Sequence, residues 1–236
     1  MKEKILYAMM VLASGVFVTS CSTTVPFAFT NTFYISSDHV REIVEGPWEV
    51  INKTQFRVIM DHNEKIIFII GRDSILVDYK DNFNFFVTKP DDDWFPGIDE
   101  RIKIHSGFYK RYKSVRNALL ETAYKYPDYS IYVSGYSLGG TWTQLFLLDA
   151  ILLWPDRDIR AIFYAAANPW RKLPEKYRKE LEQRTIFIKT YWDPVTWMSV
   201  IGFYRYGHNI TVGKWWRIFP PQHGPPQMIR ALDELF

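Results

Sequence analysis

Residues 130–146 constrain the fold of this 236-residue chain more than any other segment; they read Ser-Ile-Tyr-Val-Ser-Gly-Tyr-Ser-Leu-Gly-Gly-Thr-Trp-Thr-Gln-Leu-Phe. Residues 131–134 alternate in the manner of a strand. Residues 145–154 are apolar almost throughout, which is typical of a helix buried against a sheet. A serine with a glycine two residues away on each side lies between them. The sequence therefore predicts a strand, a sharp turn at Ser137 and a helix.

The pattern around Ser137 is Gly-x-Ser-x-Gly, completed by Gly135 and Gly139. A serine turned sharply between a strand and a helix has a strained backbone, and the chain passes close to itself on both sides. The two glycines remove the bulk that would block this turn. The helix dipole and the free N–H groups at a helix N-terminus favour developing negative charge. The turn thus predicts that Ser137 is a nucleophile; the alternative is a glycine-rich turn with an incidental serine.

The rest of the chain predicts an α/β fold. The expected strands cover residues 48–52, 56–60, 65–71, 160–167, 185–191 and 210–212, and the expected helices cover residues 108–126 and 174–183, with a short helix at the C-terminus. From the middle of the chain onward, strands and helices alternate, which indicates a mainly parallel central sheet with helices on both faces. We expect the many aromatic residues, 17% of the chain, to fill the core of one domain.

A nucleophilic serine needs a histidine base that is oriented by a carboxylate. In α/β-hydrolases these groups follow the serine in the order acid, then histidine. Among the later acids only Asp193 directly follows a buried strand, and catalytic groups of a parallel sheet lie at the carboxyl ends of its strands. Two histidines remain as bases: His223, in a loop bounded by proline and glycine, and His208, before a short strand. We favour His223, and we expect the earlier His105 to be structural.

The N-terminus has the pattern of a targeting signal. Residues 1–4, Met-Lys-Glu-Lys, form a short charged region, and residues 5–18 are apolar but too short to span a bilayer comfortably. The apolar region ends in Val-Thr-Ser-Cys at residues 18–21. This segment resembles a bacterial lipoprotein signal that is cleaved before Cys21. Cys21 is the only cysteine, so an intramolecular disulfide is excluded. The alternatives are an ordinary signal peptide, which gives a secreted protein, or an uncleaved anchor.

These observations predict three parts: a signal peptide at residues 1–20, a linker at residues 21–46 and a single domain at residues 47–236. The lipoprotein reading places the protein in a bacterial cell envelope, held on a membrane by the lipidated N-terminus. The net charge of +3 is small and dispersed, so we expect no nucleic-acid partner.

Three motifs carry a resemblance to a known family. Residues 104–108, Ile-His-Ser-Gly-Phe, match its H-x-G-F motif, residues 136–140, Tyr-Ser-Leu-Gly-Gly, match [HY]-S-L-G-G, and residues 193–195, Asp-Pro-Val, match D-x-V. With these motifs in this order, residues 65–225 resemble the class 3 lipases, the fungal-type triacylglycerol lipases and their bacterial relatives. The resemblance implies an α/β-hydrolase fold, an ester substrate and a triad of Ser137, Asp193 and His223. The late D-H-x-x-Y loop of the family corresponds here to Gln-His-Gly-Pro at residues 222–225.

The oxyanion hole follows from the motif and from the family. The backbone N–H of Leu138, directly after the nucleophile, should be one donor. The family has R-G-[ST] after its first central strand, and this chain has Gly-Arg-Asp, ending at Asp73. The backbone N–H of Asp73 could be the second donor, although an ionised carboxylate there would oppose a developing negative charge. Either the carboxylate of Asp73 faces away from the oxyanion, or Ser74 takes the place of Asp73 in the oxyanion hole.

Two further segments have two interpretations each. Residues 88–97 occupy the position of the family's lid, where Trp94 and Phe95 could form an apolar flap or belong to a plain surface loop. The apolar residues at 197–203 could line an acyl pocket or fill the core.

The sequence thus predicts a serine hydrolase that cleaves carboxylic esters of lipids through an acyl-enzyme, with no metal or organic cofactor. The alternatives are a phospholipase or a non-lipolytic esterase on the same fold, and an envelope lipoprotein that uses a decayed hydrolase as a binding or scaffold module.

Overall fold

The computed structural model describes residues 35–45, 47–52, 54–72, 86–91, 101–214 and 223–235, without the side chains of residues 198–200. The helices are α2 (Ser37–Glu45), α4 (Ser106–Lys125), α5 (Leu138–Leu153), α6 (Glu175–Arg184) and α7 (Pro225–Asp233), with a 3₁₀ helix η3 (Pro194–Ile201). The strands are β1 (Glu49–Ile51), β2 (Thr54–Asp61), β3 (Ile66–Gly71), β4 (Val87–Thr88), β5 (Lys103–His105), β6 (Ser130–Tyr136), β7 (Ile159–Tyr164), β8 (Trp170–Lys172), β9 (Thr185–Thr190) and β10 (His208–Val212).

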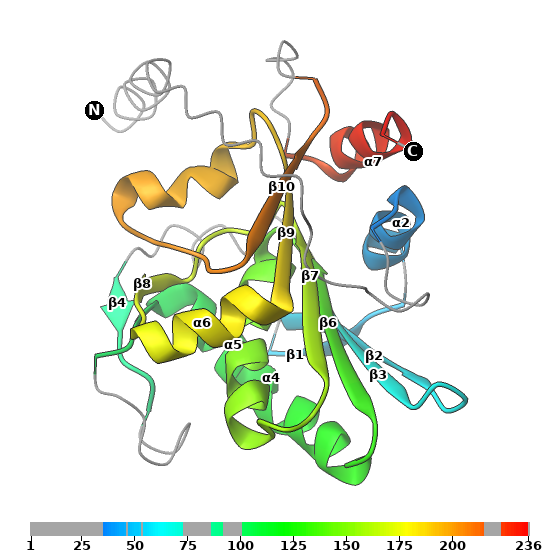
Figure 1. The fold of residues 1–236 in the computed structure, drawn as a ribbon, viewed down its shortest axis with the longest axis vertical. Coiled ribbons are helices and arrows are strands. Elements are labelled where there is room, and N and C mark those ends of the chain that lie inside the picture. Colours follow the sequence, from blue (N-terminus) through cyan, green and yellow to red (C-terminus); the bar gives the residue numbers. More distant parts are fainter. Residues whose placement is uncertain are drawn as a thin grey trace.

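The described strands form two sheets. In the central sheet seven strands lie in the order β1-β2-β3-β6-β7-β9-β10 (Figure 1). In this sheet β3, β6, β7, β9 and β10 run parallel to one another, whereas β2 pairs antiparallel with both β3 and the edge strand β1. The short strands β4, β5 and β8 form a separate antiparallel sheet. The expected α/β architecture with a mainly parallel sheet is confirmed.

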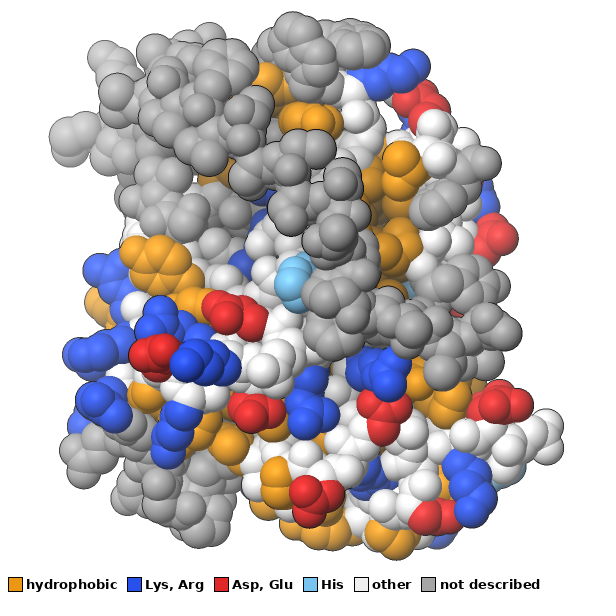
Figure 2. All heavy atoms as spheres, viewed as in Figure 1, with side chains coloured by type: hydrophobic (Ala, Val, Ile, Leu, Met, Phe, Trp, Pro, Cys, Tyr) orange, Lys and Arg blue, Asp and Glu red, His pale blue; other side chains and the backbone are white. Residues whose placement is uncertain are grey.

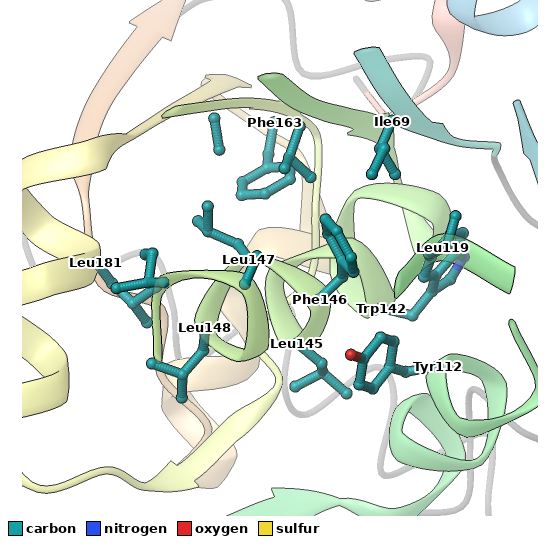
Figure 3. Packing of buried hydrophobic residues seen from close by; sticks show 14 of the residues in the cluster. Ile69, Tyr112, Leu119, Trp142, Leu145, Phe146, Leu147, Leu148, Phe163 and Leu181 are labelled. Atoms are coloured by element: carbon teal, nitrogen blue, oxygen red, sulfur yellow. The ribbon is translucent and has the colours of Figure 1, made fainter. Parts of the chain in front are cut away.

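Helices cover both faces of the central sheet because its strands are apolar on both faces. In β6, Ile131 and Val133 pack into the core cluster that contains α4, α5 and α6, whereas Tyr132 and Tyr136 pack into the cluster that contains α2 and α7. Helix α5 is buried along nearly its whole length because it lies between the sheet and its two neighbouring helices. Figure 3 shows its leucines and phenylalanine pointing toward strand residues such as Phe163 and toward the neighbouring helices. This packing fixes the turn that precedes α5.

Helix α2 differs from the expected linker at residues 21–46. Its Val40 and Ile43 are fully buried, and it packs against α7, where Arg41 forms an ion pair with Asp233 at 3.1 Å. A nine-residue helix gains most of its stability from tertiary packing. The short, largely polar sequence of α2 is therefore not enough to predict a helix there. His39 also lies in this helix. The folded domain therefore begins before residue 47.

The charged side chains on the described surface are mixed in sign. Acidic and basic groups are interspersed on the face shown in Figure 2, in keeping with the dispersed charge of the sequence. Among the described helices, none is both long and apolar enough to cross a membrane.

Candidate active site

Ser137 lies at the turn between β6 and α5 in a strained conformation. Its φ is +50° and its ψ is −121°, and its N–H donates to the carbonyl of Tyr164 at 2.9 Å. A positive φ is uncommon for a residue that carries a Cβ. The expected strained turn is thus confirmed. Ser137 thus lies at the carboxyl edge of the sheet, directly beyond the end of β6.

The glycines of the motif are needed because backbone segments touch there. A Cβ on Gly139 would lie 2.1 Å from the carbonyl oxygen of Arg72, and a Cβ on Gly135 would lie 2.6 Å from the amide nitrogen of Gly140. Both contacts are with backbone, which cannot rotate away. The first turn of α5 therefore packs directly on the ends of β3 and β6, as expected from the sequence.

Asp193 is placed by a local capping arrangement. It lies three residues beyond the end of β9 and directly precedes η3, which begins at Pro194. Its Oδ1 accepts the N–H of Val195 at 3.0 Å, and its carbonyl accepts the hydroxyl of Thr196 at 2.9 Å. Aspartate at such a cap, followed by proline at the first helical position, is a favoured helix start. The carboxylate is fully buried.

His223 joins Ser137 and Asp193. Its Nδ1 lies 2.8 Å from Oδ1 of Asp193, and its Nε2 lies 2.8 Å from Oγ of Ser137. An ionised carboxylate only accepts hydrogen bonds, so Nδ1 carries the proton and Nε2 is left to accept one from the hydroxyl. The His223 side chain is 24% exposed, so solvent reaches the site from the side of the imidazole. The structure brings the three predicted residues into one hydrogen-bonded chain.

The other candidate base, His208, lies elsewhere. It begins β10, where it is opposite Ile186 of the parallel strand β9, whereas Val212 at the other end of β10 is opposite Thr190. His208 is therefore at the amino end of the strand, and Asp193 lies beyond the carboxyl end. The structure does not bring the two together.

His105 has the structural position that the sequence suggests. It is buried, and its ring stacks on Phe108 with centroids 3.9 Å apart. Burial lowers the pKa of His105 to about 4, so the imidazole is neutral at physiological pH. Phe203 packs at 5.1 Å from the same ring, which places this member of the 197–203 segment in the core.

Two partly buried cations, Lys189 and Arg205, lie close enough to Asp193 to interact with its charge. Burial lowers the pKa of Arg205 to about 10, against the opposing effect of Asp193. The pKa of Lys189 is lowered mainly by burial and, to a smaller extent, by the charge of Arg205. The charge of Asp193 acts in the opposite direction and raises this pKa. Arg205 is held by the carbonyl of Ala166 at 2.9 Å. These charges compensate the buried carboxylate. A lysine inside a buried strand is a signal that could have revealed Lys189; no sequence signal marks Arg205.

Leu138 is the first residue of α5, and N–H groups in the first turn of a helix have no intrahelical acceptor. This placement suits the expected oxyanion donor. The second expected donor, Asp73, and its alternative Ser74 lie outside the described residues, and so do Cys21 and the residues of the expected flap, Trp94 and Phe95. Within the described ranges, no cluster of three or more His, Cys, Asp and Glu side chains could hold a metal ion.

Comparison with known proteins identifies the family of this chain. The family described as Lipase (class 3) matches residues 67–201, more than half of the sequence. The chain belongs to the class 3 lipase family. A lipase of Rhizomucor miehei is 28% identical over 134 residues, which are 55% of this chain and 35% of the relative. The chain thus matches about a third of the length of that relative.

Solved structures of triacylglycerol lipases share the fold. A triacylglycerol lipase of Penicillium expansum superposes with a TM-score of 0.56 at 20% identity, covering 71% of this chain and 68% of the other. Another triacylglycerol lipase, described as having a serine protease triad as its catalytic centre, superposes with a TM-score of 0.57 at 18% identity, covering 76% and 77%. The predicted α/β-hydrolase fold is therefore confirmed.

Proposed function

We propose that this class 3 lipase-family protein is a serine hydrolase that cleaves carboxylic esters of lipids through an acyl-enzyme. The observation that carries the proposal is the chain of two 2.8 Å contacts from Ser137 through His223 to the buried Asp193. Such a chain is how a weak nucleophile is activated by a base that a third group orients. The relatives that are lipases support a lipid ester as the substrate.

The geometry supports a specific role for each group. The Oγ of Ser137 attacks the ester carbonyl while Nε2 of His223 takes its proton, and Asp193 stabilises the imidazolium through Nδ1–H. The backbone N–H of Leu138 is placed to stabilise the oxyanion. Collapse of the tetrahedral intermediate expels the alcohol, which takes the proton from Nε2. Water then attacks the acyl-enzyme, with His223 acting again as base, and releases the acid.

The hydrogen-bonded chain argues against a decayed scaffold, because a protein that only binds has no need to hold Ser137 at a positive φ beside a buried acid. A phospholipase or a non-lipolytic esterase would use the same three residues and would differ in the groups that contact the head group and acyl chain.

Ester turnover tests the proposal. Purified protein should hydrolyse p-nitrophenyl esters, with higher kcat/KM for long than for short acyl chains if the substrate is a lipid. Ser137→Ala should abolish turnover, and His208→Gln, which changes the histidine at the opposite end of the sheet, should retain it. Turnover of no ester above the level of Ser137→Ala would contradict the proposal. Preference for acetate over long chains would indicate a non-lipolytic esterase.

We further propose that Cys21 is lipidated and anchors the protein to a bacterial envelope membrane. The support is a single cysteine directly after a charged and then apolar N-terminal segment. Each buried CH₂ of an acyl chain contributes about 0.8 kcal/mol to membrane binding. Mass spectrometry of the mature N-terminus should find acylated Cys21, and Cys21→Ser should release the protein from membranes. An unmodified Cys21 in the mature protein would contradict this part of the proposal.

A further inference from the structure

Tyr136 connects the strand of the nucleophile to the backbone of the base. It is the last residue of β6, directly before Ser137, and its side chain is fully buried. Its hydroxyl donates a hydrogen bond to the backbone carbonyl of His223. The two rings also lie near each other, with centroids 6.1 Å apart. One residue thus joins the Ser137 turn to a loop 86 residues further along the chain.

This bond differs in kind from the two that hold the imidazole. The contact between Nε2 of His223 and Oγ of Ser137 is broken as a hydrogen bond when the serine is acylated, because the hydroxyl proton has gone. Of these two imidazole hydrogen bonds, the one between Nδ1 and Asp193 then remains. The bond from Tyr136 is made to the main chain and takes no part in proton transfer, so acylation of Ser137 does not itself remove it.

The neighbouring strand provides a matched comparison. Tyr164 is the register partner of Tyr136 at the end of β7, and it is also fully buried. Its hydroxyl lies 3.0 Å from Nδ1 of His39 in α2. Two buried tyrosines at the same level of the sheet thus each bind a histidine from a distant segment. Of these, only Tyr136 binds the histidine that contacts Ser137.

We propose that Tyr136 is a positioning residue, which holds His223 at the distance and angle that proton transfer requires. The proposal rests on the proposed role of His223 as general base. Without the hydroxyl, the backbone of His223 loses its bond to the end of β6, and the imidazole can shift away from Ser137 by fractions of an ångström. The effect should be largest in deacylation, when the Ser137 contact no longer helps to hold the ring.

The kinetic test compares Tyr136→Phe with the matched control Tyr164→Phe. Both variants lose only a hydroxyl and keep the ring and the backbone, including the Tyr164 carbonyl that accepts the N–H of Ser137. Cooperative thermal unfolding should verify that both fold. For Tyr136→Phe we expect kcat for a p-nitrophenyl ester to fall roughly 10- to 100-fold with KM changed less than about twofold. The burst of p-nitrophenol should become more prominent because deacylation is slowed more than acylation. For Tyr164→Phe, kcat should stay within about twofold of the parent. Equal losses of kcat in both variants, or no loss in Tyr136→Phe, would overturn the proposal.

A spectroscopic measurement separates this inference from the proposed enzymatic activity. The Nδ1–H proton of His223 should give a downfield NMR signal, assigned by its loss in His223→Gln. Tyr136→Phe should shift or broaden this signal, and Tyr164→Phe should leave it in place, whether or not the protein hydrolyses esters. An unchanged signal in Tyr136→Phe would overturn the positioning role. Absence of turnover in the parent protein, with the signal shifted as expected, would contradict the proposed function and leave the positioning role standing.

Discussion

The N–H of Ser137 donates to the carbonyl of Tyr164 at 2.9 Å, and this bond ties a residue at φ +50° to the end of the adjacent strand. A side chain at such a backbone position costs about 1–3 kcal/mol, which the surrounding structure must offset. The turn therefore stores strain at the residue that we assign as the nucleophile.

Removing the Cβ of Ser137 should release this strain. We expect Ser137→Gly to be more stable than Ser137→Ala by about 1 kcal/mol, because relief of strain exceeds the extra flexibility of glycine in the unfolded chain. Both variants lack the hydroxyl, so both should be inactive. Urea unfolding of the two proteins measures the difference; an alanine variant at least as stable as the glycine variant would show that the turn is not strained.

Gly139→Ala should damage the fold where α5 meets β3. The new Cβ would lie 2.1 Å from the carbonyl oxygen of Arg72, so one backbone segment must move. We expect a loss of roughly 2–4 kcal/mol in the free energy of unfolding and a loss of ester hydrolysis. Gly224→Ala is the control, because the one very short contact of its Cβ, at 2.5 Å, would be with the movable end of the Gln227 side chain. That variant should lose about 1 kcal/mol or less. Equal losses in the two variants would contradict the close approach.

Asp193→Asn should lower kcat by about 10³–10⁴-fold, because an amide does not hold the imidazole in the required tautomer or stabilise its protonated form. The same change leaves Arg205 and Lys189 without the carboxylate that compensates them. We therefore expect Arg205→Met to be less destabilising in the Asp193→Asn protein than in the parent, with a coupling energy of about 1–3 kcal/mol. Chemical unfolding of the parent, both single variants and the double variant measures it. Additive effects would show that Arg205 does not act on Asp193.

The buried His105 should make stability depend on pH. In the unfolded chain this imidazole takes up a proton near pH 6.5, whereas in the folded protein burial delays protonation to about pH 4. Between these values protons bind preferentially to the unfolded chain, so stability falls as the pH is lowered from 6.5 to 4, by about 3 kcal/mol. His105→Gln should flatten the slope in this window. An unchanged slope in urea unfolding of the variant would contradict the role of His105.

Local chemistry explains which parts of this site are predictable from sequence. The turn at Ser137 is marked by its glycines, and the acid turn at Asp193 is marked by a buried strand followed by proline. The position of His223 depends on a loop without periodicity, so the sequence narrows the base to two histidines. The structure distinguishes them through strand register, since His208 lies at the amino end of β10.

Contacts between distant segments were beyond prediction. Helix α2 is short and largely polar, and its Val40 and Ile43 become buried only through packing in the cluster that includes α7. Likewise, the link from Tyr136 to His223 joins residues whose proximity no local pattern encodes. Local sequence patterns do not predict which distant surfaces pack against each other.

The most direct test of the account is active-site labelling with a fluorophosphonate, which reacts with an activated serine and forms a stable covalent adduct. We predict that the native protein takes up one equivalent, that peptide mapping places it on Ser137, and that Ser137→Ala takes up none. His223→Gln should react far more slowly. Absence of labelling in the folded native protein, or labelling of a different serine, would contradict the account.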